Sequence, residues 1–475
     1  MKKIYKSIMF AAAATMLSGA VSAQNLNSAY FLDGYTYGHQ LNPAKDYDRN
    51  GYVSFPILGN YNVGMTGNLS LTDFLKFDPK GQLTTFMNPS ISVKDALSGF
   101  SANNNLNMDM RMEILSFGFH AWGGYNTFSL GLRANSGINA PYELFEFAKN
   151  LTNKDYDISD VSSTASVWSE IGLGHSRKVA DAWRVGGKVK FLVGGARTKV
   201  QLKNAHLNLT GTDQWILSAN AQADVSIKGF GWGEMEKNKY SDGSSYEQIN
   251  FDNVELQSNQ IGPNGFGLAF DLGAEWDLEE QGWVEGMKVS ASLLDLGFIS
   301  WKENHNAYNL GKEVVFTGFN DIQIENGPGV SVEDQADDYG DRFSSLLAMQ
   351  DGGVTKLTTS LGATMNIGVE YAMPFYKKLS VGLLSTTRFQ GEYTWNEERI
   401  SATISPVKWF ELSANFGFGT RGTSFGWVAN IHPRGFNLFV GMDHMVGTLS
   451  KQGVPLKSNT GLTFGINFPF GKSKM

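Results

Sequence analysis

The chain has 475 residues, no cysteine and a formal net charge of −7 at pH 7. The absence of thiols excludes disulfide and thiolate chemistry, and the acidic balance argues against a nucleic-acid partner, which needs a basic face. Fifty-four glycines, 13% aromatic residues and only 12 prolines favour many strands and tight turns over helices.

Residues 1–23 have the pattern of a cleavable export signal. Lys2 and Lys3 give a basic start, an apolar run follows at 8–17, and Val21-Ser22-Ala23 is a small-x-small cleavage site. Such a segment is removed after export. We therefore expect the mature chain to begin at Gln24, without a lipid anchor because that residue is not cysteine.

Residues 24–51 precede the first predicted strand and are unusually aromatic for a free tail. They contain Tyr30, Phe31, Leu32, Tyr35 and Tyr37. Disordered tails are poor in aromatic residues, so we predict a plug inside the lumen of a barrel, with a free periplasmic tail as the alternative.

Two short motifs lie within this segment. Asn42-Pro43-Ala44 should turn the chain into the first strand, because Pro43 fixes φ and biases Asn42 away from helix. Asp46 to Gly51 matches the first half of a calcium loop. That loop needs a glutamate at its twelfth position, where this chain has Ile57, so we interpret the motif as a polar turn.

From residue 52 onward, apolar and polar side chains alternate in segment after segment. The clearest is 215–227, where Ala221 and Val225 share one face and Asn220 and Asp224 share the other. Strand side chains alternate with period two, so this strand has one apolar and one polar face. Similar segments lie at 106–121, 128–133, 183–193, 266–276, 287–293, 361–371, 410–418, 436–442 and 462–470, and weaker ones near 52–66, 161–175, 377–391, 397–405 and 423–432.

This recurrence predicts a transmembrane antiparallel β-barrel of about 14 strands, apolar towards lipid and polar towards the lumen. Apart from the signal, no run approaches the ~20 apolar residues of a membrane-spanning helix, and a closed barrel is the other structure that satisfies its backbone in lipid. The alternative is a soluble β-sandwich, whose strands are usually shorter. We expect a bulge near Leu115, where the apolar parity flips, and a tight turn at 433–435.

Longer inserts interrupt the strands and should lie mainly outside the cell. Short helices are expected at 73–75 and 93–97, and a helix at 141–151 with Pro141 near its first turn. An acidic cluster at 333–341 precedes another expected helix at 342–349. The four inserts are 69–104, 141–151, 231–263 and 303–355.

The chain resembles the long-chain fatty-acid transporter (FadL-like) barrels in a combination of three features. These are the export signal, the tripeptide Asn42-Pro43-Ala44 just before a first strand at Tyr52, and long alternating strands to the C-terminus. More narrowly, the chain is similar to uncharacterised Bacteroidota barrels of that superfamily. The resemblance covers most of the chain and implies a barrel of about 14 strands with an N-terminal plug folded inside. The chain departs from the family at its end, where Gly471 to Met475 follow Phe470 in place of an aromatic terminus.

The polar faces carry charges of both signs, and two interpretations stay open. These residues either filter solutes along a lumen or form ion pairs across it that hold the barrel and its plug. The lumen-lining candidates are Asp109, Arg111, Glu113, Arg184, Lys188, Asn220, Gln222, Asp224, Asp271, Glu275, Glu370 and Glu411.

The sequence predicts no catalytic residues, metal ligands or cofactor. Its seven histidines are scattered, and no H-E-x-x-H or paired metal spacing occurs. Asp443-His444 is the one adjacent acid–histidine pair, but neighbours on a strand point to opposite faces.

The predicted organisation is a signal peptide at 1–23, a plug at 24–51 and a barrel at 52–475. The first functional hypothesis is passive, porin-like transport of small hydrophobic molecules across the outer membrane. The second is a non-enzymatic accessory barrel in a secretion or assembly complex. The expected partners are outer-membrane lipid, a hydrophobic ligand and other envelope proteins, and fold alone does not choose between the hypotheses.

Overall fold

The computed structural model describes residues 26–56, 58–150, 152–210, 215–239, 245–250, 253–257, 262–309, 314–316, 348–420, 422–445 and 459–473. The expected signal peptide and the acidic cluster lie outside these residues. So do residues 342–347 of the expected helix at 342–349. Its last residue, Met349, begins a strand instead.

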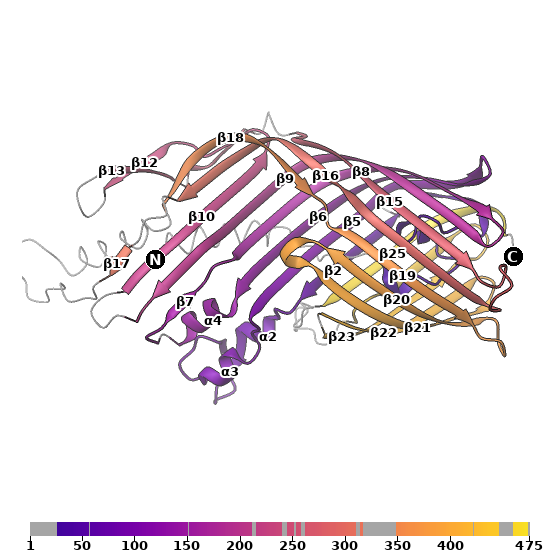
Figure 1. Cartoon of the computed structure of the whole chain (residues 1–475), viewed down its shortest axis with the longest axis horizontal. Helices are drawn as coiled ribbons and strands as arrows, with labels where there is room; N and C mark the ends of the chain where they lie inside the picture. The colour runs from indigo at the N-terminus through magenta and orange to yellow at the C-terminus, as the bar shows by residue number, and fades with distance from the viewer. Residues whose placement is uncertain are drawn as a thin grey trace, which may run out of the picture.

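Within the described residues, fourteen strand positions close into an antiparallel barrel (Figure 1), which confirms the predicted fold. The last strand pairs with the first, and this pairing closes the ring. Three positions are each shared by two strands in succession. In order around the ring the positions are β1 (Arg49–Ser54) with β2 (Asn60–Gly67), β5 (Asn103–Ala121), β6 (Gly124–Pro141), β8 (Val161–Ala180), β9 (Trp183–Asn208), β10 (Trp215–Ile227) with β15 (Gly265–Asp277), β16 (Met287–Asn309), β18 (Met349–Ser360) with β19 (Ala363–Ala372), β20 (Leu379–Phe389), β21 (Trp395–Val407), β22 (Phe410–Gly419), β23 (Gly422–Ile431), β24 (Asn437–Met442) and β25 (Thr460–Ser473). Two more positions are extended by short strands, β7 (Asp155–Asp157) beyond β8 and β17 (Val314–Phe316) beyond β16.

Side-chain alternation along these strands separates the two surfaces of the wall. Apolar side chains such as Phe191, Phe270 and Phe416 are exposed on the outside, whereas charged neighbours such as Lys190 and Asp271 are buried inside. An apolar exterior and a polar interior are what lipid outside and a closed barrel require.

Among the described residues, no helix combines the length and the apolar character needed to cross a bilayer.

The two ends of the barrel differ. Where β1 begins and β25 ends, the connections are short, as at Trp122–Gly123 and Lys408–Trp409. At the opposite end, strands of 20, 26 and 23 residues (β8, β9 and β16) rise beyond strands of 10 or 11 residues (β19, β20, β22 and β23). The barrel therefore has a tall wall, formed by β8, β9, β10 and β16, and a low wall opposite (Figure 1).

Several local predictions are confirmed. The register of β5 against β6 shifts between Glu113 and Leu115, where the bulge was expected. A turn with Gly435 at φ 91° joins β23 to β24. Helix α3 (Val93–Leu97) lies as predicted, and α4 (Tyr142–Lys149) has Pro141 as its N-cap residue. Helix α2 spans Leu71–Phe74, close to the helix expected at 73–75.

Other predictions were wrong. Residues 303–309 and 349–355 were expected in an insert, but they continue β16 and form β18. The single strand expected near 52–66 is two strands, because the chain leaves the wall between Ser54 and Asn60. β1 also begins at Arg49 rather than at residue 52.

One position in the tall wall is filled by two strands that are far apart in sequence. β10 ends with Ile227 opposite Ala196 of β9, and β15 begins with Gly265 opposite Gly194 of the same strand. Between them lies an insert, 228–264, with the short strands β11 (Phe230–Gly231), β12 (Met235–Lys239), β13 (Ser245–Ile249) and β14 (Glu255–Leu256).

The insert corrects the expectation that the apolar face of β10 meets lipid. Ala221 is only 4% exposed and belongs to a buried cluster with Trp232 and Ile249 of the insert. The alternation in 215–227 therefore marks a strand correctly, but protein covers the apolar face at Ala221.

Candidate functional site

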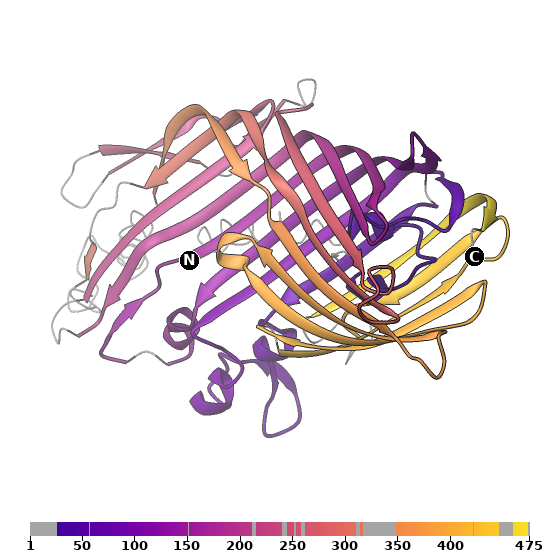
Figure 2. The same ribbon diagram turned by 45° about the vertical axis from the view of Figure 1, so that its right-hand side comes forward.

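The described residues fill the barrel interior at three successive levels. The first is the N-terminal segment, residues 26–48, which includes the 3-10 helices η1 (Asn27–Ala29) and η2 (Gly38–Gln40). Its aromatic side chains form one buried cluster with wall residues that include Tyr52, Tyr125 and Phe439. Figure 2 shows this segment in indigo within the ring of strands.

Polar contacts fix the N-terminal segment to the wall. The backbone N–H groups of Asn27 and Ser28 donate to the Asp443 carboxylate at 2.7 and 2.6 Å. The Gly34 N–H donates to Glu411 at 3.0 Å. Buried N–H groups need hydrogen-bond acceptors. These carboxylates supply acceptors to a segment that has little secondary structure of its own.

Small residues of the wall make room for the segment. A Cβ atom on Gly382 would lie 2.5 Å from the Phe31 ring, and one on Gly186 would lie 2.1 Å from the Pro43 carbonyl oxygen. Glycine lets another part of the chain approach closely. Several glycines of the barrel are therefore explained by what lies against them.

The turn at Asn42-Pro43-Ala44 lies against the same wall. The Asn42 Oδ1 accepts from the Ala44 N–H at 2.9 Å, and its Nδ2 donates to the Ala274 carbonyl at 3.2 Å. Earlier in the segment, His39 Nε2 lies 3.0 Å from the Tyr52 hydroxyl. Burial lowers the pKa of His39 well below its usual value, so the ring is neutral at pH 7.

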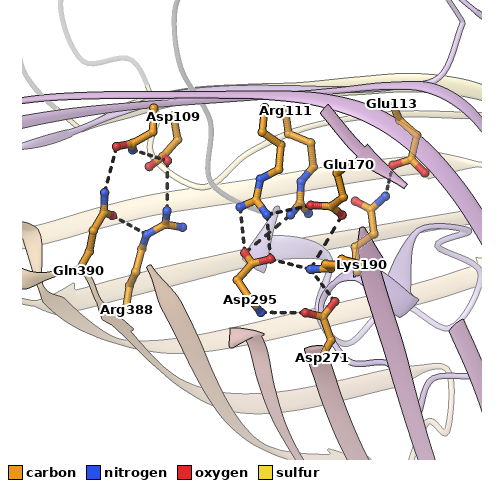
Figure 3. A network of polar contacts seen from close by, with 12 residues as sticks. Asp109, Arg111, Glu113, Glu170, Lys190, Asp271, Asp295, Arg388 and Gln390 are labelled. Carbon is orange, nitrogen blue, oxygen red and sulfur yellow. Dashed lines mark hydrogen bonds and ion pairs between the residues drawn. The ribbon is translucent and has the colours of Figure 1, made fainter. Parts of the chain in front are cut away.

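The second level is a network of buried charges centred on Asp295 (Figure 3). Asp295 lies within a register shift between β15 and β16, after Leu293 and before Leu296, and has φ 60°, a left-handed conformation. Such bulges redirect a side chain. The Asp295 carboxylate accepts two hydrogen bonds from Arg133 at 2.7 and 2.8 Å and one from Lys190 at 2.5 Å.

The network is balanced in charge. Lys190 also lies 2.7 Å from Asp271, and Arg133 lies 3.1 Å from Glu170. Arg111 reaches Asp295 at 3.9 Å. Three cations and three carboxylates from β5, β6, β8, β9, β15 and β16 therefore meet away from water, where an unpaired charge would be costly.

The third level is the cross-barrel loop, residues 390–394, between β20 and β21. Next to it, Arg388 donates to Asp109 of β5 at 3.2 Å. β5 and β20 lie seven positions apart in the fourteen-position ring, so this pair joins opposite walls. Gln390 donates to Asn135 of β6 at 3.1 Å.

The same loop reaches further along the opposite wall. The Ser162 hydroxyl of β8 donates to Glu392 at 2.7 Å. A Cβ atom on Gly137 of β6 would lie 2.6 Å from the Tyr393 ring.

Two cavities within the described part each have a volume of about 10 Å³, which is room for about one water molecule.

The structure distributes the twelve predicted lumen residues over different surroundings. Asp109, Arg111 and Asp271 join the contacts described above, and Glu411 holds Gly34. Five others have local polar contacts: Glu113 with Gln40, Arg184 with Asp46, Gln222 with Gln201 and Lys203, Asp224 with Asn304, and Glu370 with Ser380. Glu275 is paired with Arg184 in the β9–β15 ladder, and Lys188 is buried beside a small cavity. Asn220 is exposed.

The twelve lumen-lining candidates omitted five residues of these levels: Arg133, Glu170, Lys190, Asp295 and Arg388. Glu170 lies in a strand that was predicted only weakly. The bulge places Asp295 out of phase with Leu293, so its inward direction is hidden in the sequence. Asp46, the first residue of the calcium-like motif, is bound by Arg184 at 3.0 Å and His120 at 2.6 Å. The two members of the adjacent acid–histidine pair have different partners. Asp443 accepts hydrogen bonds from the N-terminal segment, and His444 lies 3.9 Å from Glu397.

Solved structures with a similar chain course include the toluene transporter TodX of P. putida, with 10% identity, coverage of 91% of this chain and 93% of that chain, and a TM-score of 0.40. A FadL homologue of Pseudomonas aeruginosa has 10% identity, coverage of 96% and 100%, and a TM-score of 0.40. The translocator domain of the autotransporter NalP of Neisseria meningitidis has 8% identity, coverage of 95% and 99%, and a TM-score of 0.32. Likeness at this level supports no argument about function.

No curated protein matches the chain. A family model does match it, over residues 43–443. The match includes the turn at Asn42-Pro43-Ala44 from Pro43 onward and nearly the whole barrel. The chain therefore belongs to the family described as a family of unknown function, DUF5723.

Proposed function

We propose that this protein is an outer-membrane barrel through which small hydrophobic molecules pass passively, leaving sideways into the lipid. In this proposal the N-terminal residues 24–48, which precede β1, are a plug, and the family is a Bacteroidota branch of the FadL-like barrels. The observation that carries the proposal is the interruption of the first wall position.

The interruption lies between β1 and β2. Ser54 pairs with Ser116 of β5, and the next pair along this edge joins Tyr61 to Met112. On the other side, β25 pairs with Val53 and then with Asn60. Between these pairs the first strand bulges out of register, with one hydrogen bond to β25, from the Ile466 N–H to the Leu58 carbonyl at 2.7 Å. The side chains of Phe55 and Leu58 are 50% and 39% exposed there.

The N-terminal segment lies directly behind this interruption. Gln40 donates to Glu113 of β5, and Asn60 donates to Gln40 at 3.1 Å. Movement of Gln40 and its neighbours would therefore uncover the inner side of this interruption. This arrangement supports a plug that closes a lateral path.

A lateral path favours apolar solutes for a physical reason. A polar molecule gains nothing by entering hydrocarbon, because its polar groups lose their hydrogen bonds there. An apolar molecule gains free energy in proportion to the area it removes from water. The exposed Phe55 and Leu58 side chains beside the interruption fit such a solute.

The filled interior favours the second candidate function, an accessory barrel without transport. Three levels of contacts occupy the described interior, and a scaffold needs no path through it. The two candidates differ in one measurable property, which is the uptake of an apolar probe by membranes that contain only this protein.

A removable lock on the N-terminal segment tests the proposal. Ser28 and Gly426 of β23 are neighbours: a Cβ atom on Gly426 would lie 2.5 Å from the Ser28 hydroxyl oxygen, 2.5 Å from Asn415 and 2.8 Å from Arg399, so a disulfide can join the two positions once the Asn415 and Arg399 side chains shift. The Ser28→Cys/Gly426→Cys variant should admit a fluorescent apolar probe into vesicles when reduced and much less when oxidised. Each single variant and the cysteine-free parent control for the oxidant. Uptake equal to that of protein-free vesicles in both states would refute transport and favour the scaffold.

A further inference from the structure

A small module outside the barrel has its own apolar core. Residues 68–102 carry α2, α3 and the hairpin of β3 (Leu75–Phe77) and β4 (Leu83–Thr85), and they pack against α4. The Phe100 and Phe145 rings stack at 4.0 Å between centroids and 10° between planes. These contacts hold the module as a compact unit next to the end of β2.

The module lies against the outside of the wall. Its core includes Leu106 of β5 and Ala140 of β6. Leu106 alternates with Asp109, which points inward to Arg388, so Leu106 points outward. The module therefore flanks the barrel on the side of the lipid-facing surface, as Figure 1 also shows for α2 and α3.

The hairpin exposes an apolar pair at its tip. Phe77 and Leu83 are directly paired across the two strands, and they are 71% and 60% exposed. The turn between them is held by Asp78, whose carboxylate accepts from the N–H groups of Lys80 and Gln82 at 2.9 and 2.7 Å. Exposed apolar side chains on a well-held element mark a contact surface.

The charges around the hairpin indicate what covers it. Within the described part of the chain, Lys76, Lys80 and Lys94 form no close ion pair, although the charge of Lys76 acts on the Asp73 carboxylate from a longer distance. In contrast, the nearby acids accept local hydrogen bonds: Asp73 from the Ser70 N–H, Asp78 in its turn, and Asp95 from the Ser92 hydroxyl. Lysines that flank apolar side chains suit a membrane surface with anionic headgroups.

We propose that the β3–β4 hairpin inserts Phe77 and Leu83 into the outer-facing leaflet of the membrane, with the three lysines at the lipid phosphates. The proposal follows from the lateral position of the module, the exposed apolar pair and the lysines without close ion pairs. It does not rest on transport, because a scaffold barrel would carry the same anchor.

Site-directed spin labelling tests this proposal, and the chain has no native cysteine to interfere. Nitroxides are placed at Phe77→Cys and Leu83→Cys, with Gln82→Cys at the exposed turn as the matched control. The protein is reconstituted in vesicles of phosphatidylcholine and phosphatidylglycerol. Collision rates with oxygen, which concentrates in lipid, and with a water-soluble nickel chelate are then measured.

We expect the ratio of oxygen to nickel collisions to be several-fold higher at positions 77 and 83 than at position 82. A further variant with Lys76, Lys80 and Lys94 changed to glutamine should lower the ratio at 77 in these anionic vesicles. Equal nickel access at 77, 82 and 83 would overturn the proposal. Protection of 77 and 83 from both reagents would also overturn it, because protein would then cover the pair.

Discussion

Replacing Asp295 by asparagine should destabilise the barrel by about 3–5 kcal/mol, the usual cost of breaking a buried ion pair. The carboxylate receives hydrogen bonds from Arg133 and Lys190, and its side chain is only 3% exposed. Without its charge, three cations face two carboxylates in the network. Asparagine adopts the left-handed conformation as readily as aspartate does, so the backbone at φ 60° is preserved.

The measurement is equilibrium unfolding in guanidinium with the protein in vesicles, followed by tryptophan fluorescence. Glu285→Gln is the matched control, because it removes a carboxylate from an exposed ion pair with Lys377 and should leave the transition unchanged. Adding Arg111→Met to Asp295→Asn leaves two cations against two carboxylates, keeps the Arg133–Glu170 and Lys190–Asp271 pairs and should recover part of the loss. A loss below about 1 kcal/mol, typical of surface pairs, would refute the view of Asp295 as the centre of a dry network.

Three further predictions concern the contents of the barrel and the insert. Arg388→Ala should increase ion conductance in planar bilayers, because it removes the pair with Asp109 that joins opposite walls; unchanged conductance would show that other contacts close this level. Deleting residues 26–40 should leave a barrel that still resists SDS before heating but conducts more, and an unaltered conductance would contradict a plug. Ala221→Arg should release the insert and cost about 1–3 kcal/mol by overpacking, seen as faster proteolysis within 228–264, whereas Asn220→Arg on the exposed side should cleave at the parental rate.

The barrel could be predicted from sequence because its strands repeat one simple rule. Within the membrane, every outward side chain meets hydrocarbon, so apolar and polar residues must alternate. The rule fails at the far end of the tall wall, opposite the end where β1 begins. Residues 303–309 are polar on both faces, and 349–355 are rich in glycine and polar residues, so neither segment shows the signal.

The contacts inside the barrel could be predicted only in kind. The sequence placed Asp109 and Arg111 on a polar face, but their partners Arg388 and Asp295 are distant in the chain and meet them only through ring closure. The interruption at 55–59 had a visible signal in Pro56 and Gly59, because proline cannot donate to the strand ladder and glycine weakens it. Alternation alone passed over both residues.

At the wall position shared by β10 and β15, the hydrogen-bonded sheet is continuous although the two strands are not consecutive in the chain. Both strands pair with β9, and Asn264 completes the junction through hydrogen bonds to Gly194, Lys302 and Glu303. A chain cut within 228–264 would keep each strand beside β9. The protein should thus tolerate being made as two complementing fragments, and this wall is a natural place for a circular permutation or a genetically inserted reporter.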